Sequence, residues 1–97
     1  MACYFQIQNL AIDTSSWTAV VTPIACTSID IQQTDGTNAI KVRTTASDSN
    51  TEKSIPVGSS LNLPTSAGGA TPWEAGVTVC YLQAAAGVGP VVIEFLR

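Results

Sequence analysis

The chain contains no histidine, and this absence removes several kinds of chemistry. Histidine is the usual general base of Ser-His-Asp and Cys-His sites and a common metal ligand, so neither type of catalytic site nor a histidine-based metal site is expected. A glycosidase-like site made of two carboxylates remains open. The candidate acids are Asp13, Asp30, Asp35, Asp48, Glu52, Glu74 and Glu94. Most of them fall in expected turns or on solvent-facing strand positions, so the sequence favours a protein that is not an enzyme and has no cofactor.

Charge is scarce as well. Charged residues make up 11% of the 97-residue chain, against about 25% in a typical globular protein. The charged residues are replaced by Thr, Ser, Asn, Gln and Ala, so the surface is polar but nearly uncharged. Because Lys and Glu are depleted in protein–protein interfaces, such a chain can commit much of its surface to contacts. A small secreted-type β domain with a Ser/Thr-rich surface is the competing interpretation.

The few basic residues exclude some partners. Lys41, Arg43, Lys53 and Arg97 are too few for a phosphate-binding stripe, and the net charge is −3. Nucleic acid is therefore not an expected partner. No apolar run approaches the roughly 20 residues of a membrane-spanning helix, so no membrane association is expected. The first ten residues carry no Lys or Arg, which is unlike a secretory signal and indicates a protein that is made in a cytosol.

Three cysteines, Cys3, Cys26 and Cys80, are odd in number and widely spaced. This spacing fits neither a disulfide framework nor a metal-ligand cluster. We expect no disulfide and no metal site, with Cys26 and Cys80 as buried free thiols.

Alternation of apolar and polar residues at period two dominates the rest of the sequence, and turn residues interrupt it. The segments that carry the pattern are 4–10, 17–22, 26–33, 38–45, 54–57, 60–63, 76–84 and 91–96. Seven or eight short strands with Gly/Pro turns predict one all-β domain over residues 1–97, an antiparallel β-sandwich or jelly roll.

Three arrangements follow from the pattern. Segments 26–33 and 38–45 flank Asp35-Gly36, a strong hairpin signal, so they are expected to pair as a hairpin. In segment 4–10, Phe5 and Ile7 share one face, and Gln6 and Gln8 share the other. Glu94 is expected to pair with Lys41 or Arg43 across the sheet.

Apolar residues occupy both faces of segments 76–84 and 91–96. Such strands are typical of sheet interiors, and a domain this small has little material to cover both faces. We therefore expect apolar surface to remain for a partner; the candidate interface residues are Trp73, Leu82, Val92 and Leu96. In the competing account, loops 46–54 and 64–72 cover these strands. Trp17 is expected to fold back onto the sandwich edge, whereas Trp73 fits either that role or an exposed anchor.

Residues 55–96 carry a series of turn and strand motifs: IPVG at 55–58, LNL at 61–63, WEAGVTVCYLQA at 73–84 and AGVGPVVIEFL at 86–96. Together they resemble small β-sandwich virion accessory proteins of tailed bacteriophages, of the capsid decoration or cement type. The resemblance covers about half of the chain; residues 1–50 show no such motif. It implies a structural protein of the virion, made in the host cytoplasm, that stabilises neighbouring capsid subunits. Its partners would be the major capsid protein, copies of itself as a homo-oligomer (a trimer is one candidate), or both, without small-molecule ligands or catalytic residues.

Other functions stay open at this point. A carbohydrate-binding or host-attachment module of a virion fibre would use Trp73, Tyr4 or Tyr81 as a stacking platform. Another head–tail structural component is a second alternative. A small carboxylate hydrolase, which needs two acids in one cleft, is the least favoured.

Overall fold

The computed structural model describes residues 5–34, 37–64, 73–87 and 89–96. These residues form eight β-strands and one short 3-10 helix: β1 (Phe5–Ile12), β2 (Thr18–Val21), β3 (Ser28–Gln33), β4 (Ile40–Arg43), η1 (Ser49–Thr51), β5 (Lys53–Ile55), β6 (Ser60–Pro64), β7 (Thr78–Ala84) and β8 (Gly89–Leu96). Within these ranges there is no helix long and apolar enough to cross a membrane.

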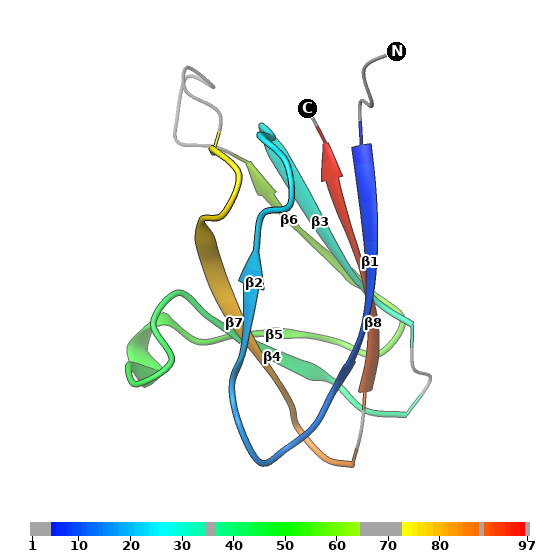
Figure 1. Ribbon diagram of the computed structural model, residues 1–97. Helices are drawn as coiled ribbons and strands as arrows, with labels where there is room; N and C mark the ends of the chain where they lie inside the picture. Colours follow the sequence, from blue (N-terminus) through cyan, green and yellow to red (C-terminus); the bar gives the residue numbers. More distant parts are fainter. Residues whose placement is uncertain (1–4, 35–36, 65–72, 88, 97) are drawn as a thin grey trace.

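The strands form two four-stranded sheets. We call them sheet A, in the order β1-β8-β3-β6, and sheet B, in the order β2-β7-β4-β5. The first strand pairs with the last, the second with the seventh, the third with the sixth and the fourth with the fifth, all antiparallel. The chain is thus one long ribbon, with its tip at η1, rolled up so that β3 also meets β8 and β4 meets β7. This is a jelly roll, and it confirms the predicted fold class (Figure 1).

The predicted hairpin of segments 26–33 and 38–45 is wrong. Those segments contain β3 and β4, which lie in different sheets. The physical reason is burial. Ile29 and Ile31 of β3 and Ile40 of β4 are all inaccessible to solvent and lie in one core cluster between the sheets. The hairpin forms one strand later, between β4 and β5, and Asp35-Gly36 lies outside the described residues.

β1 also faces the opposite way from a simple reading of its apolar residues. Ile7 lies opposite Glu94 of β8 and is 48% exposed on the outer face of sheet A. Gln6 and Gln8 lie opposite Phe95 and Ile93, whose side chains are buried between the sheets. The strand buries its other end, where Ile12 joins the core. Because β1 is an edge strand, its amides can share the inner side and still reach water at the rim.

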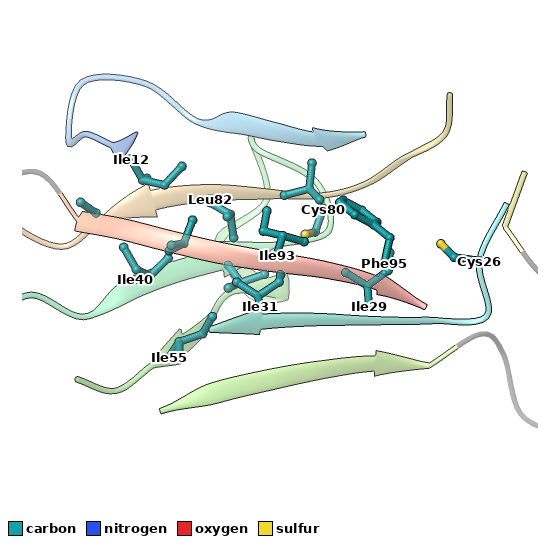
Figure 2. Close-up of a cluster of buried hydrophobic side chains, with 14 residues drawn as sticks. Ile12, Cys26, Ile29, Ile31, Ile40, Ile55, Cys80, Leu82, Ile93 and Phe95 are labelled. Carbon is teal, nitrogen blue, oxygen red and sulfur yellow. The ribbon is translucent and has the colours of Figure 1, made fainter. Parts of the chain in front are cut away.

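The core lies between the two sheets (Figure 2). Every strand except β6 contributes a buried side chain to it, and Leu61 and Leu63 of β6 are partly buried and pack against it. Its largest buried side chains are Phe95, Ile12, Ile29, Ile31, Ile40, Ile55, Leu82 and Ile93. The predicted interior strands are confirmed, because β7 lies between β2 and β4, and β8 between β1 and β3. β5 and β6 lie at sheet edges.

Polar groups inside the domain have partners. Thr22 is buried; its Oγ1 donates to the Glu74 carbonyl (2.6 Å) and accepts from the Val77 N–H (3.0 Å). The amide of buried Gln33 donates to the Asn38 carbonyl and accepts from the Gly58 N–H. These hydrogen bonds attach loops to the two sheets. Because both buried side chains are hydrogen-bonded, their removal from water costs little free energy.

Cys26 and Cys80 are buried free thiols, as expected, and Cys3 lies outside the described residues. Burial raises the pKa of both thiols, that of Cys80 to about 12. Both thiols are therefore protonated at neutral pH and behave as small apolar side chains.

Candidate interaction surfaces

The four predicted interface residues divide into two groups. The prediction that Leu82 is an interface residue is wrong, because its exposed fraction is 0%. It points inward from β7 together with Cys80 and Ala84, so the more polar alternate positions of that strand face out. Trp73 is half-buried and packs against the core. It exchanges two backbone hydrogen bonds with Cys26 (2.8 and 3.0 Å), which is the edge-capping arrangement and not an exposed anchor.

Val92 and Leu96 are both half-buried on the outer face of sheet A. Loop 46–54 does not cover them, because it belongs to the β4–β5 hairpin of sheet B. Most of loop 64–72 lies outside the described residues. Val92 and Leu96 therefore remain candidates for contact with a partner.

The outer face of sheet A, which we call the acidic face, combines apolar side chains, amides and two carboxylates. Its described side chains, read from the strand registers, are Ile7, Asn9, Ala11, Ser28, Asp30, Gln32, Ser60, Asn62, Pro90, Val92, Glu94 and Leu96. Ile7 is a diagonal neighbour of both Val92 and Leu96 in the β1–β8 register. Diagonal side chains on one face lie about 7–8 Å apart and are within reach of one another. These three residues form a cluster that we call the apolar triad.

Asp30 and Glu94 lie directly opposite each other in the β3–β8 register. The expected partners of Glu94, Lys41 and Arg43, lie on β4 in the other sheet, so that prediction is wrong. The jelly roll separates the two because β4 and β8 belong to different layers. Asn62 donates through Nδ2 to Asp30 Oδ1 and to Ser28 Oγ, each at 2.8 Å. Among the described side chains of this face, no cation compensates the two acids.

Like charges directly opposite each other destabilise a sheet. We therefore expect Glu94→Gln to raise the free energy of unfolding by roughly 0.2–1 kcal/mol, with no change in fold. Urea unfolding at neutral pH and low salt measures this, and the gain should shrink in high salt because salt screens exposed charges. Glu74→Gln, at an exposed position outside the strands, is the control. An unchanged or lowered stability of Glu94→Gln would contradict the repulsion.

The outer face of sheet B is organised around Trp17. The Arg43 guanidinium lies 4.4 Å from the centre of the Trp17 ring, and the Lys41 ammonium lies 5.8 Å from it. Trp17 thus lies beneath two cations and is not among the core residues. The prediction that it folds back onto the sandwich edge is wrong. Tyr81 lies opposite Arg43 on β7. Lys41 and Arg43 thus interact with an aromatic ring of the same chain, whereas the described part of the acidic face has no cation beside Asp30 and Glu94.

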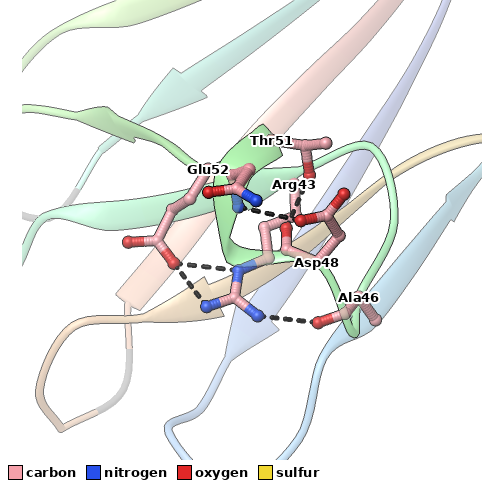
Figure 3. A network of polar contacts seen from close by, with 6 residues as sticks. Arg43, Ala46, Asp48, Thr51 and Glu52 are labelled. Atoms are coloured by element: carbon pink, nitrogen blue, oxygen red, sulfur yellow. Dashed lines mark hydrogen bonds and ion pairs between the residues drawn. The ribbon is translucent and has the colours of Figure 1, made fainter.

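Arg43 also anchors the tip of the β4–β5 hairpin (Figure 3). Its Nη2 lies 2.7 Å from Glu52 Oε1, its Nε donates to the same oxygen, and its Nη1 donates to the Ala46 carbonyl at 2.8 Å. Asp48 caps η1 by accepting the Asn50 N–H. This network gives the loop a fixed shape, although the ion pair is worth at most about 1 kcal/mol at a partly exposed site.

A shallow hollow of about 520 Å³ lies where the end of β3 meets the β5–β6 turn. It is lined by Gln32, Gln33, Thr34, Gly58, Ser59 and Ser60. Its lining offers hydrogen-bond donors and acceptors but neither a charge nor an aromatic ring. Gln33 already uses both ends of its amide within the fold, and the Thr34 hydroxyl donates to the Pro90 carbonyl. The lining side chains left for a ligand are the hydroxyls of Ser59 and Ser60 and the amide of Gln32.

No set of three His, Cys, Asp or Glu side chains within the described ranges is arranged to hold a metal ion. The acidic face is the described surface that combines an apolar triad with two carboxylates. No family model, curated protein or solved structure matches this chain.

Proposed function

We propose that this chain is a structural protein of a virus particle, a decoration or cement protein that binds and stabilises neighbouring capsid subunits through its acidic face. One observation carries the proposal: the apolar triad of Ile7, Val92 and Leu96 surrounds Glu94, which with Asp30 forms an acidic pair that no cation among the described side chains of this face compensates. Apolar groups around an unpaired charge suit a protein partner that supplies matching apolar surface and a basic side chain.

Three other features support this role. The motifs of residues 55–96 resemble those of virion accessory proteins. The surface is nearly uncharged, with 11% charged residues in the chain, so most of it can enter contacts without desolvating ions. On a repeated lattice the affinity of each single contact can be low, because many weak contacts to a symmetric array together hold a protein strongly.

Leu96→Asp tests the proposal at the triad. The variant adds a third carboxylate to the acidic face and removes one apolar contact, so binding to the partner should weaken by at least about tenfold, or 1.4 kcal/mol. Ser54→Asp, which adds the same charge at an exposed position of sheet B, is the matched control and should bind as the parent does. The measurement is co-sedimentation of purified chain with particles from its native source after removal of their own copies.

Both variants should keep the circular dichroism spectrum of the parent, because Leu96 and Ser54 lie outside the core. Native particles that contain no copies of this chain would contradict the proposed function. So would a folded Leu96→Asp variant that binds particles as tightly as Ser54→Asp.

Glycan binding by a virion fibre is a second candidate, and the hollow beside Ser59 and Ser60 favours it. Its uncharged hydroxyl and amide lining suits a neutral sugar, although it lacks an aromatic platform. Binding to a glycan array that is lost in Ser60→Val would support this function over capsid binding.

A further inference from the structure

The outer edge of β1 is unlike the other sheet edges of the domain. β1 pairs with β8 on one side and is the first strand of sheet A (Figure 1). Within the described ranges, no residue outside β8 exchanges a backbone hydrogen bond with it. Alternate residues of such an edge strand present N–H and C=O groups that are free to pair with another strand.

The hydrogen bonds of the neighbouring strands decide which residues of β1 point outward. Thr34 donates its N–H to the Pro90 carbonyl (3.3 Å), so Pro90 and every second residue after it direct their backbone toward β3. The residues between them, such as Ile93, direct theirs toward β1, where Ile93 lies opposite Gln8. Gln8 and its alternate neighbours are therefore bonded to β8. The remaining backbone groups point outward; they belong to Phe5, Ile7, Asn9 and Ala11.

The other three edge strands are each blunted against pairing. β2 has four residues and a register break at Val20/Val21. β5 has three residues, one of them Lys53, and β6 has five residues and ends at Pro64. Short length, a bulge, lysine and proline are the devices by which natural sheets avoid edge-to-edge association. β1 has none of them: its eight residues are free of charge and proline, and its register runs unbroken against β8.

We propose that β1 pairs antiparallel with β1 of a second copy of this chain, about a two-fold axis at Gln8. Another β1 is the partner that fits, because the edges of β2, β5 and β6 are too short to match eight residues. With the axis at Gln8, all four outward residues of each strand find partners: Ile7 meets Asn9 of the second copy, and Phe5 meets its Ala11. The two strands then exchange about eight main-chain hydrogen bonds, and sheet A becomes one continuous sheet through both copies.

Charge does not oppose this pairing. β1 carries no ionisable side chain, so no like charges meet across the axis. The nearest acids, one Glu94 on each β8, are separated by three strand spacings, which is at least about 14 Å. That exceeds the Debye length of about 8 Å at physiological ionic strength.

The pairing deepens the proposed function, and it rests on that function for its role in the particle. It would join two acidic faces side by side, so that one dimer presents two apolar triads to the capsid. A two-fold dimer would also replace the trimer considered from the sequence, because one isologous edge contact closes after two copies.

Sedimentation velocity of the purified chain alone tests the dimer. The parent should sediment as a species of about twice 10.1 kDa. Asn9→Pro should shift it to the monomer mass, because proline removes an outward N–H while the bonds to β8 stay intact. Ser60→Pro, at the first residue of the other edge strand of sheet A, is the matched control and should remain a dimer. A parent that is monomeric at every concentration would overturn the proposal, as would a folded Asn9→Pro variant that still dimerises.

Cross-linking tests the register without any risk of unfolding by proline. In a background of Cys3→Ser, Gln8→Cys should form an intermolecular disulfide on mild oxidation, because the two positions face each other across the axis with Cα atoms about 4.5 Å apart. Gln6→Cys should not, since its two copies are about 13 Å apart along the strands. A dimer in which Gln8→Cys stays reduced, or in which Gln6→Cys links equally well, would overturn pairing through β1.

These measurements use no particles, so they separate the two proposals. A dimer with the Gln8 cross-link that fails to bind particles would leave the pairing standing and remove the capsid role. A monomer that binds particles would do the reverse.

Discussion

Leu82→Asp is expected to unfold the domain, whereas Leu96→Asp leaves it folded. Leu82 is inaccessible to solvent at the centre of the core, and its carboxylate replacement would be buried opposite Val42 without a cationic partner. Loss of a buried leucine alone costs about 2–5 kcal/mol. The added polar group brings the total near the whole stability of a small domain, which is about 5–15 kcal/mol.

Circular dichroism and thermal unfolding measure this directly. The Leu82→Asp chain should already be unfolded at 25 °C and show no cooperative transition on heating. Leu82→Ala should unfold cooperatively, with a lower midpoint temperature than the parent. Leu96→Asp should retain a midpoint within a few degrees of the parent. A Leu82→Asp variant with the parent's midpoint would mean that Leu82 faces outward, which would reverse the assignment of the two faces of β7.

The second large effect is expected at alkaline pH. Burial raises the pKa of Cys80 from 9.0 to about 12 in the folded chain. Above pH 9 the unfolded chain loses the thiol proton while the folded chain keeps it, so the unfolded state is favoured as pH rises. The contribution of Cys80 is intact below pH 9 and declines by about 1.4 kcal/mol per pH unit up to pH 12, or about 4 kcal/mol in all.

The comparison of the parent with Cys80→Ala isolates this thiol from lysine and tyrosine titration. Urea unfolding at intervals from pH 8 to 11 should show a stability difference that is constant up to pH 9 and then narrows steadily. Parallel curves for the two proteins over that range would show that Cys80 titrates normally in the folded chain. A thiol reagent at pH 8 should leave Cys80 unmodified until denaturant is added.

Period-two alternation alone was enough to predict the fold class of this chain. The strands that contain Ile29 and Ile31, or Ile40 and Val42, alternate so regularly that no helical arrangement could bury one face of them. The two-sided apolar pattern of 76–84 and 91–96 likewise placed β7 and β8 correctly in the interior of their sheets. The free thiols of Cys26 and Cys80 followed from their number and spacing.

The sequence did not determine which strands pair with each other. Asp35-Gly36 favours a hairpin locally, but a local preference of this kind is small beside the burial of four isoleucine and valine side chains between two sheets. Alternation also shows that a strand has two faces without showing which face points inward. That is why the sequence predicts Leu82 as an interface residue although it is buried, and why it separates Gln6 and Gln8 from Ile7 without showing which of the two faces lies inward.

The sequence by itself thus determined an all-β domain of low charge, without histidine, whose apolar residues suffice for a sandwich core. Only the tertiary structure decided that Asp30 and Glu94 share one face, away from Lys41 and Arg43, and that β1 is the unblunted edge. The reason is that the pairs that define this face, Asp30 with Glu94 and Ile7 with Glu94, each join residues more than 60 positions apart. Their proximity depends on how the whole ribbon rolls up, which is a balance of burial over all the strands at once.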